Sequence, residues 1–224
     1  MNCLVSIIIA TYNSESSLSE SLVSVCQQTF QDWECIIVDG ASTDSTIKIV
    51  EEFEKRDSRI RHISEPDRGI YDAFNKGWRL AKGEWVHYLG SDDTLTKESF
   101  SALIPLVSDD IDAISGDVWI KKIDGTIKPN YSEGFSGCHQ GKLVRRTVIE
   151  KMNGFDQKYR ILADLDLMLR MRNAGCKIVN VRSFVANFLM DGASQNIKGE
   201  WKRFLERVQI YRTNNVSDYP ILTC

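Results

Sequence analysis

The first 93 residues alternate between short apolar runs and stretches with helical periodicity. The apolar runs are rich in β-branched residues, as buried strands are, and lie at residues 5–10, 33–38, 60–64 and 84–89. Apolar side chains recur at helical spacing in the stretches between them, at residues 14–28, 44–55 and 70–81. This order predicts an α/β fold in which right-handed helical crossovers join a mostly parallel central sheet.

The pattern changes near residue 94, but no repeat, low-complexity tract or linker marks a domain boundary there. We therefore predict one domain over residues 1–224, made of two halves, 1–93 and 94–195, with a C-terminal helix and tail at 196–224. Helices are expected at residues 96–107, 144–152, 162–174 and 198–213. Strands are expected at residues 113–120 and 177–181, with a hairpin return at 123–127 through Asp124-Gly125 and an irregular loop at 128–138.

Charge and cysteine usage exclude some classes of protein. The net charge is −3, and a weakly acidic chain is a poor nucleic-acid binder, so no nucleic-acid partner is expected. The six cysteines include no Cys-x-x-Cys pair, which argues against a zinc site and fits a reducing compartment. We find no signal peptide and no apolar run near the ~20 residues that span a bilayer. A cytoplasmic protein is therefore predicted.

Polar residues follow the first two strand-like runs, where an open α/β sheet borders its ligand crevice. Thr11 and Asn13 offer donors to a base or a diphosphate, and a helix-capping turn is an equally good interpretation. Asp39 ends a buried run, where a carboxylate needs a partner. An N–H of a nucleotide base or a ribose hydroxyl would serve, with Ser42 in the same loop. The alternative is an Asx turn with Asp44 as a helix cap.

A third polar stretch begins the third predicted helix. Gly69, near the helix start, permits close approach of the backbone to a ligand, and Asp67 lies beside it. Asp72, Asn75 and Lys76 share one helix face. We expect Asp67, Gly69, Asp72 and Asn75 to contact the substrate. A solvated polar face is the alternative, and it is preferred for Lys76.

Two adjacent carboxylates, Asp92 and Asp93, follow the fourth strand-like run. Adjacent acids repel one another unless they diverge or a cation lies between them. Mg²⁺ usually binds one or two carboxylates together with substrate phosphates. Because a cap for the helix at Thr96 would need only one aspartate, the pair favours a Mg²⁺ or Mn²⁺ site, with Ser91 beside it as a substrate contact.

The segments SIIIATYN, IIVDGASTD, SEPDRGIYDAFNKG and YLGSDD, in this order and spacing, resemble glycosyltransferase family 2. The resemblance covers about residues 4–195 and implies the GT-A fold, which is Rossmann-like. It implies that residues 1–93 bind a nucleotide-sugar donor and that Asp39 contacts the base. It also implies that the aspartates after the fourth strand bind the metal and the diphosphate. This sequence departs from the fullest pattern at Gly90, where many members have the first aspartate.

The second half resembles the acceptor side of the same family. The segments HQGKLVRR and NGFDQKYRILADLDLMLR are similar to the arrangement HQ…RR…GGFDE…ADYDL of other members. The resemblance places His139, Gln140 and Arg145 at the substrate and Asp164 in the position of the catalytic base. From the residues alone, Asp164 and Asp166 would complement the positive end of the helix that they begin, and this suffices for Asp166.

The predicted function is an inverting glycosyltransferase that moves a sugar from a nucleotide-diphosphate donor, with UDP-sugar the best guess, to a saccharide or lipid-linked saccharide. A sugar nucleotidyltransferase is one alternative, although it should carry a glycine-rich phosphate loop where this chain has TYNSES. A non-catalytic nucleotide- or carbohydrate-binding protein is another, and it would not need Asp164.

Two further segments carry expectations of their own. Residues 188–196 resemble the segment that closes over the nucleotide in relatives, and Asp191 lies within it. The basic and aromatic C-terminal helix, with Trp201 and Arg207, is interpreted as a contact with the inner face of a membrane, as a homo-oligomer contact, or as ordinary core packing.

Overall fold

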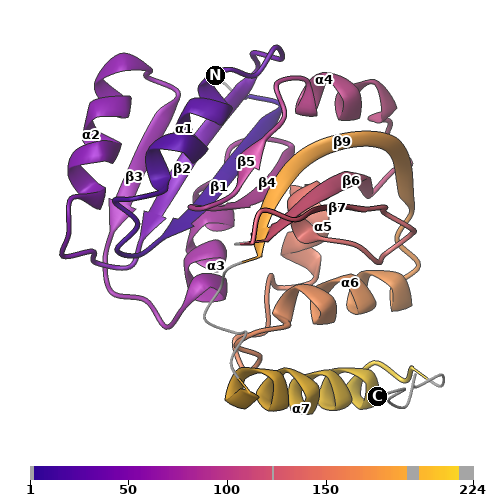
Figure 1. Cartoon of the computed structure of the whole chain (residues 1–224). Helices are drawn as coiled ribbons and strands as arrows, with labels where there is room; N and C mark the ends of the chain where they lie inside the picture. The colour runs from indigo at the N-terminus through magenta and orange to yellow at the C-terminus, as the bar shows by residue number, and fades with distance from the viewer. Residues whose placement is uncertain (1–2, 123, 191–196, 217–224) are drawn as a thin grey trace.

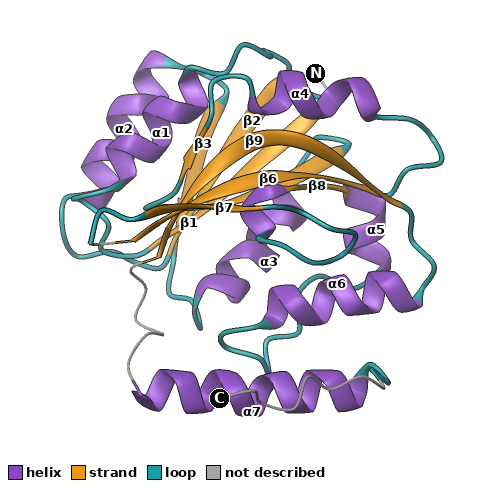
Figure 2. Ribbon diagram, turned by 45° about the vertical axis from the view of Figure 1, so that its right-hand side comes forward, coloured by secondary structure: helices purple, strands orange, loops and turns teal. Residues whose placement is uncertain are grey.

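The computed structural model describes residues 3–122, 124–190 and 197–216. Its centre is one curved sheet with helices on both faces (Figures 1 and 2), as the sequence predicts. The strand order is β3-β2-β1-β4-β8-β6-β9-β5, and β7 pairs with β6. Asp191, which was expected to lie near the nucleotide, is outside the described residues.

The first half supplies four parallel strands and three helices. The strands are β1 (Val5–Thr11), β2 (Trp33–Asp39), β3 (Ile60–Ser64) and β4 (Trp85–Gly90). The helices are α1 (Leu18–Cys26), α2 (Thr46–Arg56) and α3 (Ile70–Leu80). Every residue of β1, β2 and β4 is buried, because α1 and α2 cover one face of the sheet and α3 covers the other.

Alternation along β1 distributes its side chains between two cores. Ile7 and Ile9 pack with Leu22 of α1, whereas Ile8 packs with Phe74 of α3. Gly77 allows α3 to approach β1 closely, since a Cβ atom there would lie 2.3 Å from a methyl carbon of Ile8. This tight contact fixes the position of α3, and with it the polar residues at its start.

The second half extends the sheet and covers it. Its strands are β5 (Thr94–Leu95), β6 (Ala113–Lys122), β7 (Ile127–Asn130), β8 (Lys142–Arg145) and β9 (Ile178–Met190). Its helices are α4 (Ser99–Leu103), α5 (Arg146–Lys151), α6 (Ala163–Asn173) and α7 (Ile197–Thr213), with 3-10 turns η1 (Ile104–Leu106) and η2 (His139–Gly141). Strand β8 is antiparallel to both β4 and β6, so it joins the two halves in one sheet.

Three sequence predictions in this half are corrected. The helix expected at 96–107 is shorter, because Thr94–Leu95 pairs with β9 and the chain tightens into η1 around Pro105. The helix expected at 144–152 gives up its first residues to β8, and the strand expected at 177–181 continues to Met190. In each case pairing with a distant strand overrides the local pattern, which is why single-sequence periodicity missed it.

Helix α7 lies outside α6 (Figures 1 and 2). Glu206 joins it to the body: its carboxylate is 7% exposed and accepts the backbone N–H groups of Arg160, Ile161 and Leu162 at 2.9–3.1 Å. These bonds organise the loop that enters α6. No helix within the described ranges is long and apolar enough to cross a membrane.

The candidate active site

Asp39 lies at the carboxyl end of β2 and is fully buried. Its Oδ2 accepts the backbone N–H of Ser42 at 2.9 Å and the Ser64 hydroxyl at 2.7 Å, and its Oδ1 accepts the Ser42 hydroxyl. The carboxylate therefore has protein partners. Oδ1 still has acceptor capacity, because a carboxylate oxygen accepts about two hydrogen bonds.

The loops after β1 and β2 are tied to each other. Asn13 adopts a positive φ of 47°, donates its N–H to the Ser42 hydroxyl at 2.8 Å, and accepts the N–H of Thr43 at 2.9 Å. The polar atoms of Asn13 and Ser42 thus make bonds inside the protein, and their contact with substrate remains a prediction. Thr11 is 4% exposed and likewise faces inward.

A narrow space separates these loops from the start of α3. A Cβ atom on Gly40 would lie 2.7 Å from an Asp67 carboxylate oxygen and 3.3 Å from the ring of Tyr12. The Tyr12 ring is 62% exposed, and Asp67 accepts the N–H of Gly69 at 2.8 Å. Tyr12, Asp67 and Asp39 therefore come together at the carboxyl ends of β1 and β2.

Asp92 and Asp93 diverge. Asp92 is exposed, whereas Asp93 is 2% exposed and accepts three donors: Gln140 Nε2 at 2.9 Å, the Leu189 N–H at 2.9 Å and the Gly90 N–H at 3.3 Å. Burial, and then the neighbouring charge of Asp92, raises the pKa of Asp93 to about 6. Asp93 thus joins the loop to β9, and Gln140 holds Asp93, whereas metal binding by Asp92 and Asp93 remains a prediction.

The space around position 90 is too narrow for a side chain in this arrangement. A Cβ atom there would lie 2.7 Å from Oδ2 of Asp93 and 2.9 Å from Oδ1 of Asp92. Both carboxylates therefore fold back over Gly90. A larger residue at position 90 would displace at least one of them.

The donor set fits a cation that is held mainly by a substrate. Among the described residues no group of three or more His, Cys, Asp or Glu side chains is placed to hold a metal ion. Mg²⁺ commonly takes one or two carboxylates, with waters and substrate phosphates completing its shell. The exposed Asp92 meets that requirement as the protein ligand.

Asp164 lies in the first turn of α6, with 27% of its side chain exposed. Its Oδ2 is 3.3 Å from Nδ1 of His139, and its Oδ1 is 3.1 Å from the Tyr71 hydroxyl. Burial alone would raise its pKa. The hydrogen bond and charge of His139, the Leu165 N–H and the Tyr71 hydroxyl outweigh burial and hold the pKa of Asp164 below its usual value.

Asp166 has a different role from Asp164. It is 1% exposed, its Oδ2 pairs with Nε of Arg170 at 2.7 Å, and its Oδ1 accepts Nδ2 of Asn214 at 3.1 Å. Asp166 thus joins α6 to the end of α7, which adds a buried pair to the predicted interaction with the helix dipole.

Two predicted substrate contacts make structural contacts within the protein. Asn75 is 2% exposed and binds the backbone of Phe155 through both ends of its amide, so it holds the loop before α6. Arg145 lies beside the first residue of β4, at the opposite end of that strand from Asp92. There it pairs with Glu84, and its guanidinium carbon lies 4.6 Å from the centroid of the Trp85 ring. Its place in β8, opposite the first residue of β4, removes it from the site.

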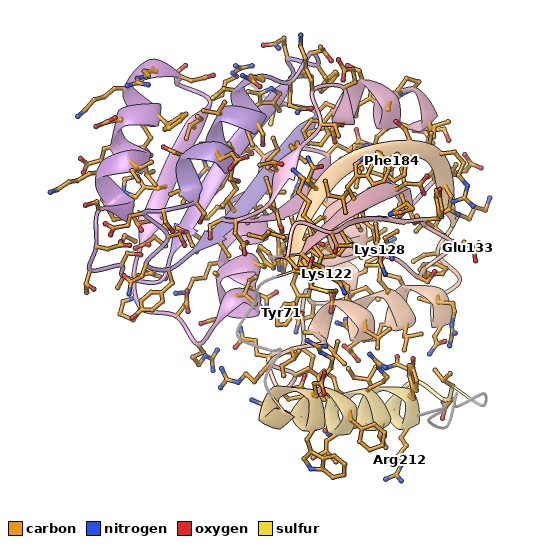
Figure 3. The ribbon with its side chains drawn as sticks, viewed as in Figure 1. Tyr71, Lys122, Lys128, Glu133, Phe184 and Arg212 are labelled. Carbon is orange, nitrogen blue, oxygen red and sulfur yellow. The ribbon has the colours of Figure 1, made fainter. Side chains whose placement is uncertain are left out.

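The structure gives Asp72 and Tyr71 contacts that the sequence did not predict. Asp72 accepts Nε2 of Gln157 at 2.7 Å and the N–H of Arg68, so it braces the α3 start. Tyr71 was not predicted to act, although its neighbours were. Its ring lies between α3 and α6 (Figure 3), and only the fold brings its hydroxyl to Asp164.

Comparison with known proteins identifies the group to which this arrangement belongs. The family model described as glycosyl transferase family 2 matches residues 6–174. The chain belongs to glycosyltransferase family 2. The match includes every segment discussed above except β9 and α7.

Relatives and solved structures support the same assignment. A PGL/p-HBAD biosynthesis glycosyltransferase of Mycobacterium bovis is 32% identical over 74% of this chain and 68% of its own length. Chondroitin synthase of Escherichia coli is 27% identical over 87% of this chain, which spans only 30% of that protein. TarS of S. aureus, solved with UDP, superposes with a TM-score of 0.76 over 96% of this chain and 66% of the TarS fragment, at 19% identity. That likeness shows the GT-A fold.

Proposed function

We propose that this chain is an inverting glycosyltransferase that transfers a sugar from a UDP-linked donor to a hydroxyl of a saccharide or lipid-linked saccharide. The observation that carries the proposal is Asp164, a partly exposed carboxylate that His139 and Tyr71 orient at the start of α6. In one displacement, the acceptor oxygen bonds to the anomeric carbon as the bond to the diphosphate breaks. The hydroxyl proton passes to Asp164, and the configuration at that carbon inverts.

The electrostatics of Asp164 suit this role. Because its pKa is held below the usual value, the carboxylate is ionised at neutral pH and able to accept a proton. His139 contacts one oxygen and Tyr71 the other, so the carboxylate has one orientation. A fixed base costs less reorganisation as the acceptor hydroxyl approaches.

The nucleotide side supports a nucleoside-diphosphate donor. The exposed Tyr12 ring offers a face on which a base can stack, and Oδ1 of Asp39 retains capacity for a donor group of the base or ribose. Asp92 would hold Mg²⁺ or Mn²⁺, which neutralises charge on the departing diphosphate when bound. TarS has been solved with UDP-GlcNAc, and a mannosyltransferase of Pyrobaculum calidifontis, with a TM-score of 0.74 and 18% identity, with GDP-Man and Mn²⁺.

Peripheral membrane contact through α7 belongs to the same proposal. Trp201 and Leu205 are 63% and 50% exposed and lie one turn apart, beside the cations Lys202 and Arg207. This is the pattern of a helix that rests at a membrane interface. Sedimentation with anionic vesicles should fall for Trp201→Ser, whereas unchanged sedimentation favours the dimer contact that was the other prediction for α7.

A thermal-shift screen of UDP, GDP and dTDP, each with and without Mn²⁺, tests the donor. A ligand that binds the folded state raises apparent stability, and at a concentration of 100 Kd the gain is about 2.7 kcal/mol. We expect UDP with Mn²⁺ to give the largest shift. If no nucleotide shifts the transition, the donor site proposed here is wrong.

A further inference from the structure

A cavity of about 460 Å³ lies between the start of α3, the loop before α6, and α7. Its walls include Arg68 and Tyr71 of the α3 start, Tyr159 and Arg160 of the loop, and Lys202 of α7. The nucleotide-side residues Asp39 and Asp92 are not part of this lining. The cavity therefore borders the proposed donor site, and its lining includes the predicted substrate contacts Gly69 and Asp72.

The cavity carries an excess of positive charge. Arg68, Arg160 and Lys202 line it against a single carboxylate, Asp72, in a chain whose net charge is −3. Asp72 is already bound by Gln157 and lies 3.6 Å from Arg68. Within the described residues, Arg160 and Lys202 form no ion pair with a carboxylate. Arg160 donates to the carbonyl oxygen of Arg68, and neither cation is balanced by a carboxylate from the described part of the chain.

Polar groups other than side-chain cations point to the same kind of ligand. Gly69 precedes the 11-residue helix α3 with a φ of 115°, and the carboxylates of Asp67 and Asp72 accept the N–H groups of Gly69 and Arg68 beside that helix start. Tyr159 is 1% exposed, and its hydroxyl makes no hydrogen bond to any described residue. Arginine forks favour phosphate or carboxylate, and a hydroxyl can donate to either anion.

Tyr71 connects this cavity to the chemistry. Its side chain forms part of the wall, and its hydroxyl is 3.1 Å from Oδ1 of Asp164. A molecule that fills the cavity would thus contact Tyr71, whose hydroxyl in turn contacts the proposed base Asp164. We propose that the cavity binds an anionic group, phosphate or carboxylate, carried by the acceptor. This inference rests on the proposed transfer function and defines its acceptor class as an anionic saccharide.

The test uses protein saturated with UDP and Mn²⁺, so that the donor site is occupied before any probe is added. Glycerol 3-phosphate, glucuronate and neutral glucose are titrated at constant ionic strength, and the amide NMR signals of Gly69, Ile70 and Tyr71 are followed. We expect saturable shifts with one or both anions and none with glucose. The two anions distinguish a phosphate-bearing acceptor from a uronic-acid acceptor.

Variants that change the charge of the cavity lining test whether the anion binds there. The double variant Arg160→Gln/Lys202→Gln should raise the anion Kd by about fivefold to thirtyfold, the loss of two partly exposed charge contacts. Arg160→Lys/Lys202→Arg keeps the charge and should keep most of the affinity. Arg207→Gln removes an exposed cation of the same helix that does not line the cavity, and it should leave the anion Kd unchanged.

The outcomes separate the two proposals. Failure of UDP with Mn²⁺ to bind in the first step contradicts the proposed function. If UDP binds but neither anion shifts these amides, or if the double variant and Arg207→Gln lose affinity equally, the anionic acceptor site is wrong while the donor site stands.

Discussion

Tyr71 and Asp164 are 93 positions apart in the sequence, and the Tyr71 hydroxyl lies 3.1 Å from Oδ1 of Asp164. The same hydroxyl is 2.8 Å from the carbonyl oxygen of Ile161, just before α6. One residue from the first half of the chain thus contacts both the proposed base and the turn before α6. Burial, and then the Asp164 charge, raises the pKa of Tyr71, so this hydroxyl stays protonated and acts as a donor.

Tyr71→Phe removes that donor and keeps the ring, which packs against Phe155 with centroids 5.2 Å apart. We expect the transfer rate to fall about tenfold, the value of a hydrogen bond to a charged group. Because the Tyr71 bond lowers the pKa of Asp164, the acidic limb of the rate profile should also move to higher pH. An unchanged pH profile of the transfer rate would show that Tyr71 serves packing alone.

Asp164→Asn keeps the shape of the base and removes its basicity. Transfer should fall by about 10²–10⁴, the usual contribution of general base catalysis, with UDP affinity within a factor of about three. Asp166→Asn is the matched control. It breaks the pair with Arg170, so it should cost about 1–3 kcal/mol of stability and leave the rate of the folded enzyme nearly intact. The reverse pattern in transfer assays and urea melts would place the base at Asp166.

Asp92→Asn and Asp93→Asn should fail in different ways. Asp92→Asn should reduce Mn²⁺-dependent UDP affinity about tenfold or more without altering stability, since the side chain is exposed. Asp93→Asn places an amide NH₂ against donors such as Gln140 and the Leu189 N–H, and should cost about 1 kcal/mol of stability. Calorimetric titration and thermal melts of both variants check this. Equal loss of metal-dependent binding in the two would support the paired-ligand prediction.

Asp39→Ala removes the predicted partner of the base or ribose. We expect UDP affinity to fall by about 1–3 kcal/mol, the range for hydrogen bonds to charged groups. Part of that loss could come from the loop that Asp39 organises through Ser42 and Ser64. Ser64→Ala removes one internal bond only and should change affinity less than about threefold. If both variants bind UDP equally well, Asp39 is a turn residue and nothing more.

Burial of the Lys142 side chain should make the stability of the folded protein depend on pH. It is 2% exposed beside the Ser136 carbonyl and the Ser115 hydroxyl, and burial lowers its pKa to about 8. In the unfolded chain the lysine has a pKa near 10.4, so between pH 8 and 10 the unfolded state binds more protons than the folded state. The free energy of unfolding should therefore rise by up to about 1 kcal/mol per pH unit in that range. Urea melts should show this rise in the wild type relative to Lys142→Met. Parallel curves for the two proteins would mean that the pKa of Lys142 is the same in the folded and unfolded states.

The four parallel strands β1 to β4 could be predicted from the sequence alone. Residues such as Ile7, Ile36 and Val86 are buried on both sides, and a short β-branched run in that setting has few alternatives to a parallel strand. The polar residues that follow these strands reach one edge because parallel strands point the same way. Asp39 and Asp92 could therefore be expected at one edge of the sheet before the fold was known, and their contact with substrate stays a prediction.

The conformation of Val144, the difference between Asp92 and Asp93, and the partner of Tyr71 depend on contacts between residues far apart in the sequence. Only the tertiary structure shows them. Val144 is compatible with a helix or a strand, and only its position between β4 and β6 makes it a strand residue. Asp92 and Asp93 are equivalent in sequence, but packing against Gln140 and β9 buries one and exposes the other. The same is true of Tyr71, whose partner Asp164 is supplied by a loop and helix that no local pattern could place beside it.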